Sequence, residues 1–349
     1  MFNLATKPSI AITGQAGLVS VIMPTFNSEA FLHQRIRSIQ MQSHHNLEVI
    51  VVDGYSTDGT WKRLQEVAQT DTRWRLYQSS PAGVYPALNE AISFSRGDYL
   101  YFAMSDDTCE PTLLQKAVSI MSRRPHVDIV QCAVAVTNSK GRILYDTRFT
   151  GDFSDYFGPM ATKPHERALA GDLRRQLVIT SLYLSLTGLV VKRSLADKAG
   201  LFPTTLCEIA DVVWATRLCA HGSSLAYIPE VLASWRRHAG QTTKCKSRAQ
   251  LLAAHAQKVT AIRSLYSDDY QFRIGKYLHE VETSALLESC TKLHSFDFWV
   301  YRAQRLYTNL RMLGAYLVGG KRALKESRQA HLLQLAPQDD VREDNLELG

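Results

Sequence analysis

Several common functional motifs are missing from this 349-residue sequence, and their absence narrows the classes of protein to consider. There is no P-loop, no GxGxxG dinucleotide fingerprint and no GxSxG nucleophile motif. The sequence also lacks zinc-finger spacing and RNP-like aromatic motifs, so nucleic acid is not an expected partner despite a formal net charge of +7. No run of about 18 apolar residues occurs, so we expect no membrane-spanning helix.

Disulfide bonds are not expected either. The six cysteines include no CxxC pair, which is typical of reduced, mostly buried thiols in the cytoplasm. The N-terminus carries one lysine and a short apolar stretch interrupted by Thr13 and Gln15, which makes a poor signal peptide. A hydrophobic fraction of 45% is sufficient for a full core. Together these features predict a cytoplasmic globular protein.

The sequence does contain a regular alternation of strand and helix patterns. The predicted strands are apolar, often β-branched runs at 18–23, 47–54, 74–77, 99–104 and 128–136. The predicted helices are amphipathic segments at 28–42, 56–68, 84–95 and 112–123. This alternation indicates a parallel sheet covered on both faces, and ligands of such sheets bind at the carboxyl ends of the strands.

The pattern is less regular in the second part of the chain. Residues 148–175 are expected to be rich in loops, 187–193 to form a strand and 210–220 a helix. The stretch "SSLAYIPEVLASWRRH" at 223–238 predicts a strand, a turn and a second strand. After about residue 246 the pattern is mostly helical, and the final "PQDDVREDNLELG" predicts a disordered acidic tail.

Acidic side chains stand where two of the predicted strands end. Asp53 closes "EVIVVD", and Asp106 and Asp107 lie side by side after the apolar run "YLYFAM". Adjacent carboxylates repel each other and are costly to desolvate unless a cation compensates them. A helix N-cap ahead of Pro111 is the plainer alternative, although a cap needs only one acid. We therefore expect a cation and a ligand at this edge of the sheet.

A series of motifs is similar in order and spacing to those of family-2 glycosyltransferases, over residues 19–243. They are "VSVIMPTFNSEAFL", "EVIVVDGYSTDGT", "GVYPALNEAI", "RGDYLYFAMSDD", "IADVVWATRL", "AYIPEVL" and "SWRRHAGQTT". The resemblance implies the GT-A fold, an α/β architecture with a Rossmann-like mixed sheet and helices on both faces. The chain is then divided into an N-terminal lead (1–17), a catalytic domain (18–245) with a nucleotide-sugar half (18–136) and an acceptor half (137–245), a helical C-terminal extension (246–335) and an acidic tail (336–349).

The resemblance implies a site for a nucleotide-diphosphate sugar and a divalent cation, Mn²⁺ or Mg²⁺. Asp107 and Asp106 resemble the DxD-type motif, with Asp107 as the direct metal ligand and His238 completing the metal shell or bonding a phosphate. Met104 stands where the family commonly has a further Asp or Asn, and Tyr55 where it usually has Gly. The residues expected to contact the nucleotide sugar are Pro24, Thr25, Glu29, Asp53, Asn89, Asp106 and Arg236.

Several of these assignments have a plainer alternative. A strand-end turn would account for Asp53, interaction with a helix dipole for Glu29, and a polar helix face for Asn89. Arg236 and His238 would also suit a solvated basic loop.

Asp211, in "IADVVW", matches the general base of inverting members of the family. Transfer with inversion needs a base to take the proton of the acceptor hydroxyl as it attacks the anomeric carbon. Val213 stands where a second acid is usual, Glu208 is a nearby second candidate, and a purely structural role for Asp211 stays open.

The resemblance thus implies a metal-dependent, inverting hexosyl- or N-acetylhexosaminyl-transferase acting on a glycan or polyprenyl-linked acceptor. Bacterial surface-polysaccharide assembly (O-antigen, capsule or exopolysaccharide) is the expected pathway. A catalytically degenerate nucleotide-sugar-binding or scaffold protein is the alternative, and Met104 and Val213 favour it. A nucleotidyltransferase would need a Gly-rich loop after the first strand, and "PTFNSEAF" is not one.

The positive charge is concentrated near the C-terminus, where residues 246–330 hold 14 basic and 7 acidic side chains. Leu306, Leu310, Leu313 and Leu317 fall on one face of a predicted helix with basic flanks. This face would either pack on the catalytic domain or on a second subunit, or lie on an anionic membrane at the inner face of the plasma membrane.

Overall fold

The computed structural model describes residues 17–150, 152–178, 182–183, 185–204 and 210–241, together with 322, 325–326, 329–330, 333 and 340–343. The predicted leucine face, Leu306 to Leu317, lies outside the described residues, as does Glu208.

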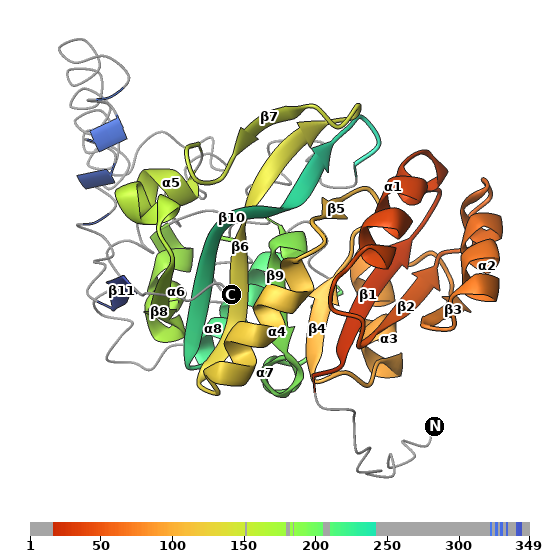
Figure 1. Ribbon diagram of the computed structural model, residues 1–349, viewed down its shortest axis with the longest axis horizontal. Coiled ribbons are helices and arrows are strands. Elements are labelled where there is room, and N and C mark those ends of the chain that lie inside the picture. The colour runs from red at the N-terminus through yellow and green to blue at the C-terminus, as the bar shows by residue number, and fades with distance from the viewer. Residues whose placement is uncertain are drawn as a thin grey trace, which may run out of the picture.

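The first half of the fold alternates strands and helices, as predicted (Figure 1). Its elements are β1 (Val19–Thr25), α1 (Glu29–Gln40), β2 (Leu47–Asp53), α2 (Thr60–Thr70), β3 (Trp74–Gln78), α3 (Val84–Phe94), β4 (Tyr99–Phe102), β5 (Thr108–Cys109), α4 (Leu113–Arg123) and β6 (Val127–Asn138). The predicted strands and helices of this half are therefore confirmed, with differences only at their ends.

The second half corrects two expectations. Its elements are β7 (Ile143–Asp146), α5 (Asp152–Phe157), a 3₁₀ helix (Gly158–Thr162), β8 (His165–Ala168), α6 (Leu169–Val178), a second 3₁₀ helix (Leu186–Gly188), β9 (Leu189–Lys192), α7 (Arg193–Ala199), α8 (Ala210–His221), β10 (Ser224–Arg237) and β11 (Val341–Glu343). Residues 148–175 are thus mostly helical rather than loop-rich. Residues 224–237 form one strand, because Pro229 lies within a register shift between Ile228 and Val231 rather than in a turn.

The strands of the described residues form one mixed sheet, in the order β11-β8-β10-β6-β9-β4-β1-β2-β3. The pairs β1–β2, β1–β4, β2–β3 and β6–β10 are parallel. Strand β9 lies between β4 and β6 and is antiparallel to both. Helices cover both faces, since adjacent residues of β1 join different cores. Val21 packs in the core that contains α1, α2 and α4, and Ile22 packs in the core that contains α3, α7 and α8.

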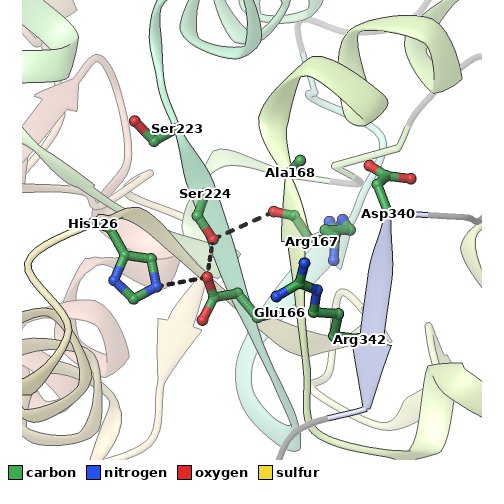
Figure 2. Close-up of a pocket in the computed structure, with 8 residues that line it drawn as sticks. All are labelled: His126, Glu166, Arg167, Ala168, Ser223, Ser224, Asp340 and Arg342. Atoms are coloured by element: carbon green, nitrogen blue, oxygen red, sulfur yellow. Dashed lines mark hydrogen bonds and ion pairs between the residues drawn. The ribbon is translucent and has the colours of Figure 1, made fainter.

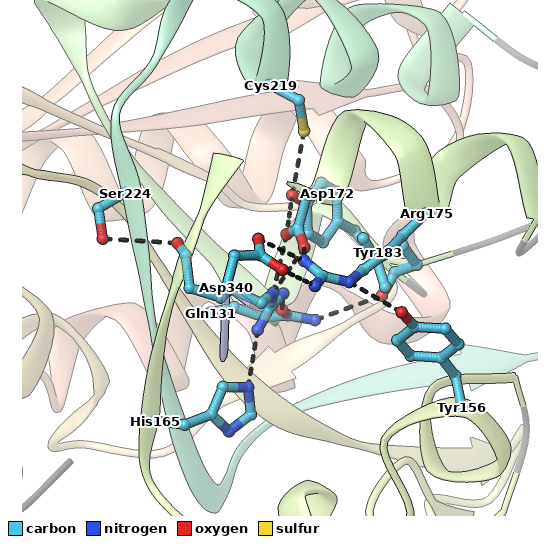
Figure 3. Close-up of polar contacts among 11 residues, drawn as sticks. Gln131, Tyr156, His165, Asp172, Arg175, Tyr183, Cys219, Ser224 and Asp340 are labelled. Carbon is cyan, nitrogen blue, oxygen red and sulfur yellow. Dashed lines mark hydrogen bonds and ion pairs between the residues drawn. The ribbon is translucent and has the colours of Figure 1, made fainter. Parts of the chain in front are cut away.

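The C-terminal tail is not disordered throughout, which corrects the expectation for residues 340–343. Strand β11 pairs antiparallel with β8 at the outer edge of the sheet. Just before it, the Asp340 carboxylate accepts hydrogen bonds from the fully buried Arg175 guanidinium. Figure 3 shows this contact within a buried polar cluster. There, Arg175 and Arg167 also donate to the buried Asp172 carboxylate, at 2.9 and 2.8 Å. Two buried guanidinium groups are thus matched by two carboxylates, one of which comes from the tail.

Candidate functional site

The carboxyl ends of β1, β2 and β4 lie next to one another and bring several predicted residues together. Thr25 and Asp53 are register partners at the ends of β1 and β2, and the Thr25 hydroxyl donates to Asp53 Oδ1 at 2.9 Å. The buried Asp53 carboxylate also accepts hydrogen bonds from the Ser56 amide (2.9 Å), the Ser56 hydroxyl (2.5 Å) and Gln78 (3.3 Å). Asp53 therefore organises the loop after β2, and its contact with a nucleotide stays a prediction.

Pro24 and Glu29 have clear structural roles at the same edge. Pro24 is buried and pairs with Val52 of β2. The pairing of β1 with β4 ends at Ile22, so the missing N–H of Pro24 removes no backbone hydrogen bond to β4. The Glu29 carboxylate accepts the Gly59 amide at 3.0 Å and ties the start of α1 to the start of α2. A Cβ at Gly59 would lie 2.1 Å from Glu29 Oε1, so this approach requires glycine.

The two adjacent acids lie under the end of β10. The Arg236 amide donates to Asp107 Oδ1 at 2.9 Å, and the Arg236 Nε donates to the Asp106 carbonyl oxygen at 2.8 Å. His238 Nε2 lies 2.9 Å from Asp106 Oδ2. The structure therefore brings Asp106 and Asp107 together with Arg236 and His238, which lie about 130 positions further along the sequence.

Asp107 is an unusually placed carboxylate. It is 1% exposed, and its Oδ2 has no hydrogen-bond partner among the described residues. Burial raises the pKa of Asp107 well above its usual range, and the neighbouring Asp106 acts in the same direction. The Arg236 amide and the charge of Arg35 lower it in part. A cation at the free oxygen would relieve both the burial and the repulsion.

The residues present fit a divalent cation whose coordination is shared with a ligand. Mg²⁺ and similar ions are often held by one or two carboxylates plus substrate phosphates. Asp107 Oδ2 and the Asp106 carboxylate can supply such oxygens. Within the described ranges, no group of three or more His, Cys, Asp or Glu side chains is placed to hold a metal alone. The remaining ligands would therefore come from water or from a bound ligand such as a phosphate.

His238 is oriented by two hydrogen bonds. The Gly240 amide donates to its Nδ1 at 3.2 Å, so in the neutral ring the proton is on Nε2 and is donated to Asp106. In this arrangement His238 orients Asp106, and its role as a metal ligand stays a prediction.

Arg236 is 3% exposed, so the alternative of a solvated basic loop is wrong for this residue. Its guanidinium donates to the Ser139 carbonyl at 3.1 Å and to Gln34 at 2.5 Å, and lies 5.0 Å from the centre of the Phe31 ring. Arg236 therefore links the end of β10 to Asp106, Ser139 and Gln34 beside the acids. Its contact with a phosphate stays a prediction.

Asn89 and Asp211 lie on helices of the other face. Asn89 exchanges two hydrogen bonds with the backbone of Phe202, at 2.9 and 2.8 Å, so its amide clamps α3 to the segment after α7. Asp211 lies in the first turn of α8. Trp214, one turn further on, packs its ring 5.2 Å from that of Phe102, the last residue of β4. The start of α8 is thus near the strand that leads to the two acids, and the catalytic role of Asp211 stays a prediction.

Arg35 was not among the predicted site residues. It is fully buried, and its Nη2 lies 3.3 Å from the Tyr101 hydroxyl and 3.5 Å from the Thr187 hydroxyl. Its Nε and Nη1 have no hydrogen-bond partner in the described part of the chain. A signal was available, because Arg35 lies at helical spacing from Leu32 and Ile39, on the face predicted to be buried. A charged residue on such a face indicates a buried charge that needs compensation, and in the structure the charge of Arg35 lowers the pKa of Asp107.

A cavity of about 340 Å³ lies away from these acids, where β6 and β10 begin (Figure 2). The Ser224 hydroxyl donates to Glu166 Oε1, and His126 Nε2 lies 2.8 Å from the same oxygen. Serine and histidine thus both bind the acid and not each other. In a nucleophilic triad the histidine contacts the serine, so these residues do not form one.

None of the helices in the described part of the chain combines the length and apolar character needed to cross a bilayer. Cys109, Cys132 and Cys219 are buried free thiols, as predicted for the cysteines.

The chain is similar to known proteins in sequence and in fold. Residues 20–178 match the model of glycosyl transferase family 2. A segment of 114 residues is 35% identical to TuaG of Bacillus subtilis, a glycosyltransferase named for teichuronic acid biosynthesis. That match covers 32% of this chain and 45% of TuaG, less than half of the relative's length.

The fold is similar to that of TarS (residues 1–349) of S. aureus in complex with UDP-GlcNAc, with a TM-score of 0.58 and 16% identity over 90% of this chain and 91% of that chain. It is also similar to the mannosyltransferase PcManGT of Pyrobaculum calidifontis in complex with GDP-Man and Mn²⁺, with a TM-score of 0.53 and 21% identity over 91% and 85% of the chains. At these identities the likeness shows the fold alone.

Proposed function

We propose that the chain transfers a sugar from a nucleotide-diphosphate sugar to a glycan acceptor, because residues 20–178 match the model of glycosyl transferase family 2 and the fold is that of GT-A glycosyltransferases. The observation that carries the proposal is the pairing of Asp106 and Asp107 with Arg236 at the carboxyl edge of the sheet. A buried carboxylate with a free oxygen, beside a second and partly exposed carboxylate, suits a divalent cation that also binds a diphosphate.

Asp107 and Asp106 would hold the cation, Mn²⁺ or Mg²⁺, and His238 and Arg236 would fix the positions of these acids. A divalent cation bound there would neutralise the charge that develops on the leaving diphosphate. Met104 packs against the apolar core, so the position of a third acid is filled by a hydrophobic side chain. Among the residues that the structure describes, these two carboxylates, with His238 as a further predicted ligand, would therefore be the chain's contribution to the metal site.

Asp211 is the proposed general base for an inverting displacement. The acceptor oxygen forms the new bond to the anomeric carbon, its proton passes to the Asp211 carboxylate, and the diphosphate leaves with the electrons of the broken bond. The proposal is supported by the position of Asp211 in the first turn of α8, a helix whose Trp214 packs against Phe102 at the end of β4.

Residues 18–136 would bind the donor and 137–245 the acceptor. The transferred sugar would be a hexose or N-acetylhexosamine, as in the UDP-GlcNAc bound by TarS and the GDP-Man bound by PcManGT, and the acceptor a glycan or a polyprenyl-linked glycan. Teichuronic acid biosynthesis, for which TuaG is named, supports a role in bacterial surface-polysaccharide assembly. Such a reaction would take place at the cytoplasmic face of the plasma membrane. Peripheral membrane binding and self-association by the C-terminal extension belong to the same proposal.

A screen of UDP- and GDP-sugars, with Mn²⁺ or with EDTA, tests the proposal. The midpoint temperature of thermal unfolding should rise with the correct donor and metal. A ligand at 100-fold excess over its dissociation constant stabilises the folded state by about 2.7 kcal/mol. Release of free nucleoside diphosphate on addition of an acceptor would demonstrate turnover. Binding without any turnover would favour the degenerate nucleotide-sugar-binding protein instead.

A further inference from the structure

Exposed apolar side chains are concentrated in one short part of the chain, residues 139–150, here called the β7 segment. Among the residues that the structure describes, seven large apolar side chains are more than half exposed, and three of them belong to this segment. They are Ile143 (63% exposed) and Leu144 (52%) on β7, and Phe149 (61%) on the turn that follows. Single exposed apolar residues are ordinary, whereas a cluster of them marks an interaction surface.

A β-bulge accounts for the exposure of two adjacent apolar residues. Strand β7 pairs antiparallel with β6, and the register shifts between the pairs Val136–Tyr145 and Thr137–Ile143. Leu144 therefore has no partner residue on β6. Neighbours on a regular strand point to opposite faces, and a bulge changes the direction of the side chains beside it. Among the described strands β7 pairs only with β6, so this apolar pair lies at an edge of the sheet.

The turn before β7 presents two basic side chains in an ordered backbone. The side-chain oxygen of Asn138 accepts hydrogen bonds from the amides of Lys140 and Arg142, each at 3.0 Å. Gly141 supplies the left-handed φ of 81° that this turn requires. Lys140 and Arg142 are exposed, and neither forms an ion pair within the described ranges. Their charges are therefore available to a partner outside the chain.

The β7 segment has a net positive charge. It holds three basic side chains and one acidic one. The acid, Asp146, accepts hydrogen bonds from Arg148 Nε at 3.0 Å and from Arg148 Nη2 at 3.1 Å, so these two charges compensate each other. The charges of Lys140 and Arg142 remain beside the apolar side chains. Apolar groups flanked by uncompensated basic groups match a surface that is apolar inside and anionic outside, which is the composition of an anionic bilayer.

The turn of the β7 segment also adjoins the candidate site. Arg236 Nη1 donates to the Ser139 carbonyl at 3.1 Å, while its Nε donates to the Asp106 carbonyl at 2.8 Å. A Cβ at Gly141 would lie 3.6 Å from the same Nη1. One guanidinium thus contacts both the turn and the acidic site. Figure 1 shows β7 at the top of the molecule, beside the ends of β6 and β10.

We propose that the β7 segment docks the chain on an anionic phospholipid bilayer. Ile143, Leu144 and Phe149 would enter the interface between headgroups and acyl chains, and Lys140 and Arg142 would contact lipid phosphates. This membrane surface goes beyond sugar transfer and is distinct from the C-terminal extension. Docking would hold the candidate site at the membrane, and only this consequence for a lipid-linked acceptor rests on the proposed function.

Co-sedimentation of the full chain with vesicles, without donor or metal, tests the proposal. The chain should bind vesicles of phosphatidylglycerol and phosphatidylcholine, bind weakly to phosphatidylcholine alone, and be released as salt is added. Lys140→Gln and Arg142→Gln should each weaken binding by about 5-fold. Lys62→Gln removes an exposed charge from α2 and serves as the matched control, with binding unchanged.

The apolar contribution is tested by a double variant, Ile143→Ser with Leu144→Ser, which should bind anionic vesicles about 10-fold or more weakly. Met41→Ser removes a side chain that is 53% exposed at the end of α1, and it should bind as the wild type does. Thermal unfolding should be nearly the same for all these variants, because the replaced side chains are exposed. In Leu144→Trp, brominated acyl chains should quench more fluorescence than in the wild type or in Met41→Trp.

Several results would overturn the proposal. They are a wild type that binds no anionic vesicles, a double variant that binds as tightly as the wild type, and an equal loss in Met41→Ser. A wild type that ignores vesicles but forms dimers, which the double variant dissociates, would make the β7 segment a protein interface instead. None of these results affects the donor screen, which contains no lipid, so failure of this inference is distinguishable from failure of the proposed function.

Discussion

The Arg236 amide donates to Asp107 Oδ1 at 2.9 Å and joins two residues that are 129 positions apart. One oxygen of the carboxylate is thereby fixed by the end of β10, and the other is left without a partner among the described residues. Residues 18–136 and residues 137–245, the proposed donor and acceptor halves, are thus joined at a single side chain. The chemistry proposed for this edge depends on that contact.

Removal of the Asp107 carboxylate should abolish metal-dependent donor binding. We expect Asp107→Ala, and the isosteric Asp107→Asn, to lose Mn²⁺-dependent UDP binding, because the diphosphate charge would be uncompensated in a low-dielectric site. Asp106→Ala should weaken binding less, since Asp106 is partly exposed and oriented by His238. Calorimetry in Mn²⁺ and in EDTA measures both effects. Wild-type affinity of all three variants in EDTA would contradict a metal site.

Replacement of Asp211 by asparagine tests the general base. Asp211→Asn keeps the size and polarity of the side chain but cannot take a proton. Turnover should fall by about 10²- to 10⁴-fold with donor binding nearly unchanged. Steady-state release of nucleoside diphosphate, with calorimetry of the same variant, gives both numbers. An active Asp211→Asn together with an inactive Glu208→Gln would transfer the role to Glu208.

The C-terminal tail should contribute to the stability of the catalytic domain. Asp340→Ala leaves the buried Arg175 guanidinium without the carboxylate that Nη2 contacts, and we expect a loss of about 1–3 kcal/mol in the free energy of unfolding. Arg342→Ala changes an exposed residue of the same strand and should stay within about 0.5 kcal/mol. Denaturant unfolding of both variants makes the comparison. Equal stability of the two would show that Asp340 adds nothing.

Stability should fall on mild acidification because of His165. Its Nδ1 lies 3.0 Å from the Lys163 carbonyl and its Nε2 lies 3.1 Å from Arg167 Nη1, so Nδ1 donates a hydrogen bond to the carbonyl and Nε2 accepts one from the guanidinium. Burial lowers the pKa of His165 to about 3, and the Arg167 charge acts in the same direction. The unfolded chain, with an ordinary pKa of 6.5, binds the proton more readily. The stabilisation is complete above pH 6.5 and declines as the pH falls toward 3.

Denaturant unfolding at pH 7 and at pH 5.5 should show a loss of about 1 kcal/mol that is attributable to His165. His165→Asn keeps a side-chain donor for the Lys163 carbonyl but does not titrate in this range. Its stability should therefore change less between the two pH values. The same change in both proteins would assign the pH dependence to other groups.

Much of the candidate site at the carboxyl edge of the sheet could be predicted from the sequence. Asp53, Asp106 and Asp107 could be placed at strand ends because apolar runs and helix starts locate those ends, and the parallel pairing of β1, β2 and β4 then makes them neighbours. The sequence does not reveal which hydrogen bonds these side chains make within the protein. The bond from Thr25 to Asp53 and the clamp between Asn89 and Phe202 depend on side-chain geometry that no spacing rule contains.

The second half of the fold was harder to predict for a different reason. Strand β8 and helix α6 carry Arg167, Asp172 and Arg175, which look like surface charges in the sequence. In the structure all three are buried and neutralise one another or pair with Asp340. A local hydrophobic pattern cannot reveal burial that depends on an ion pair with a segment far away in the chain.

The β11–β8 pairing also has a consequence for the order of folding. Arg175 and Asp340 are separated by 165 positions, so closing this loop is entropically costly and is expected late. Until then, the outer edge of β8 has unpaired backbone groups and Arg175 lacks part of its charge compensation. Such an edge can pair with another chain. Refolding at high protein concentration should therefore favour aggregation through β8, and hydrogen exchange should find residues 165–168 protected later than β1 and β2.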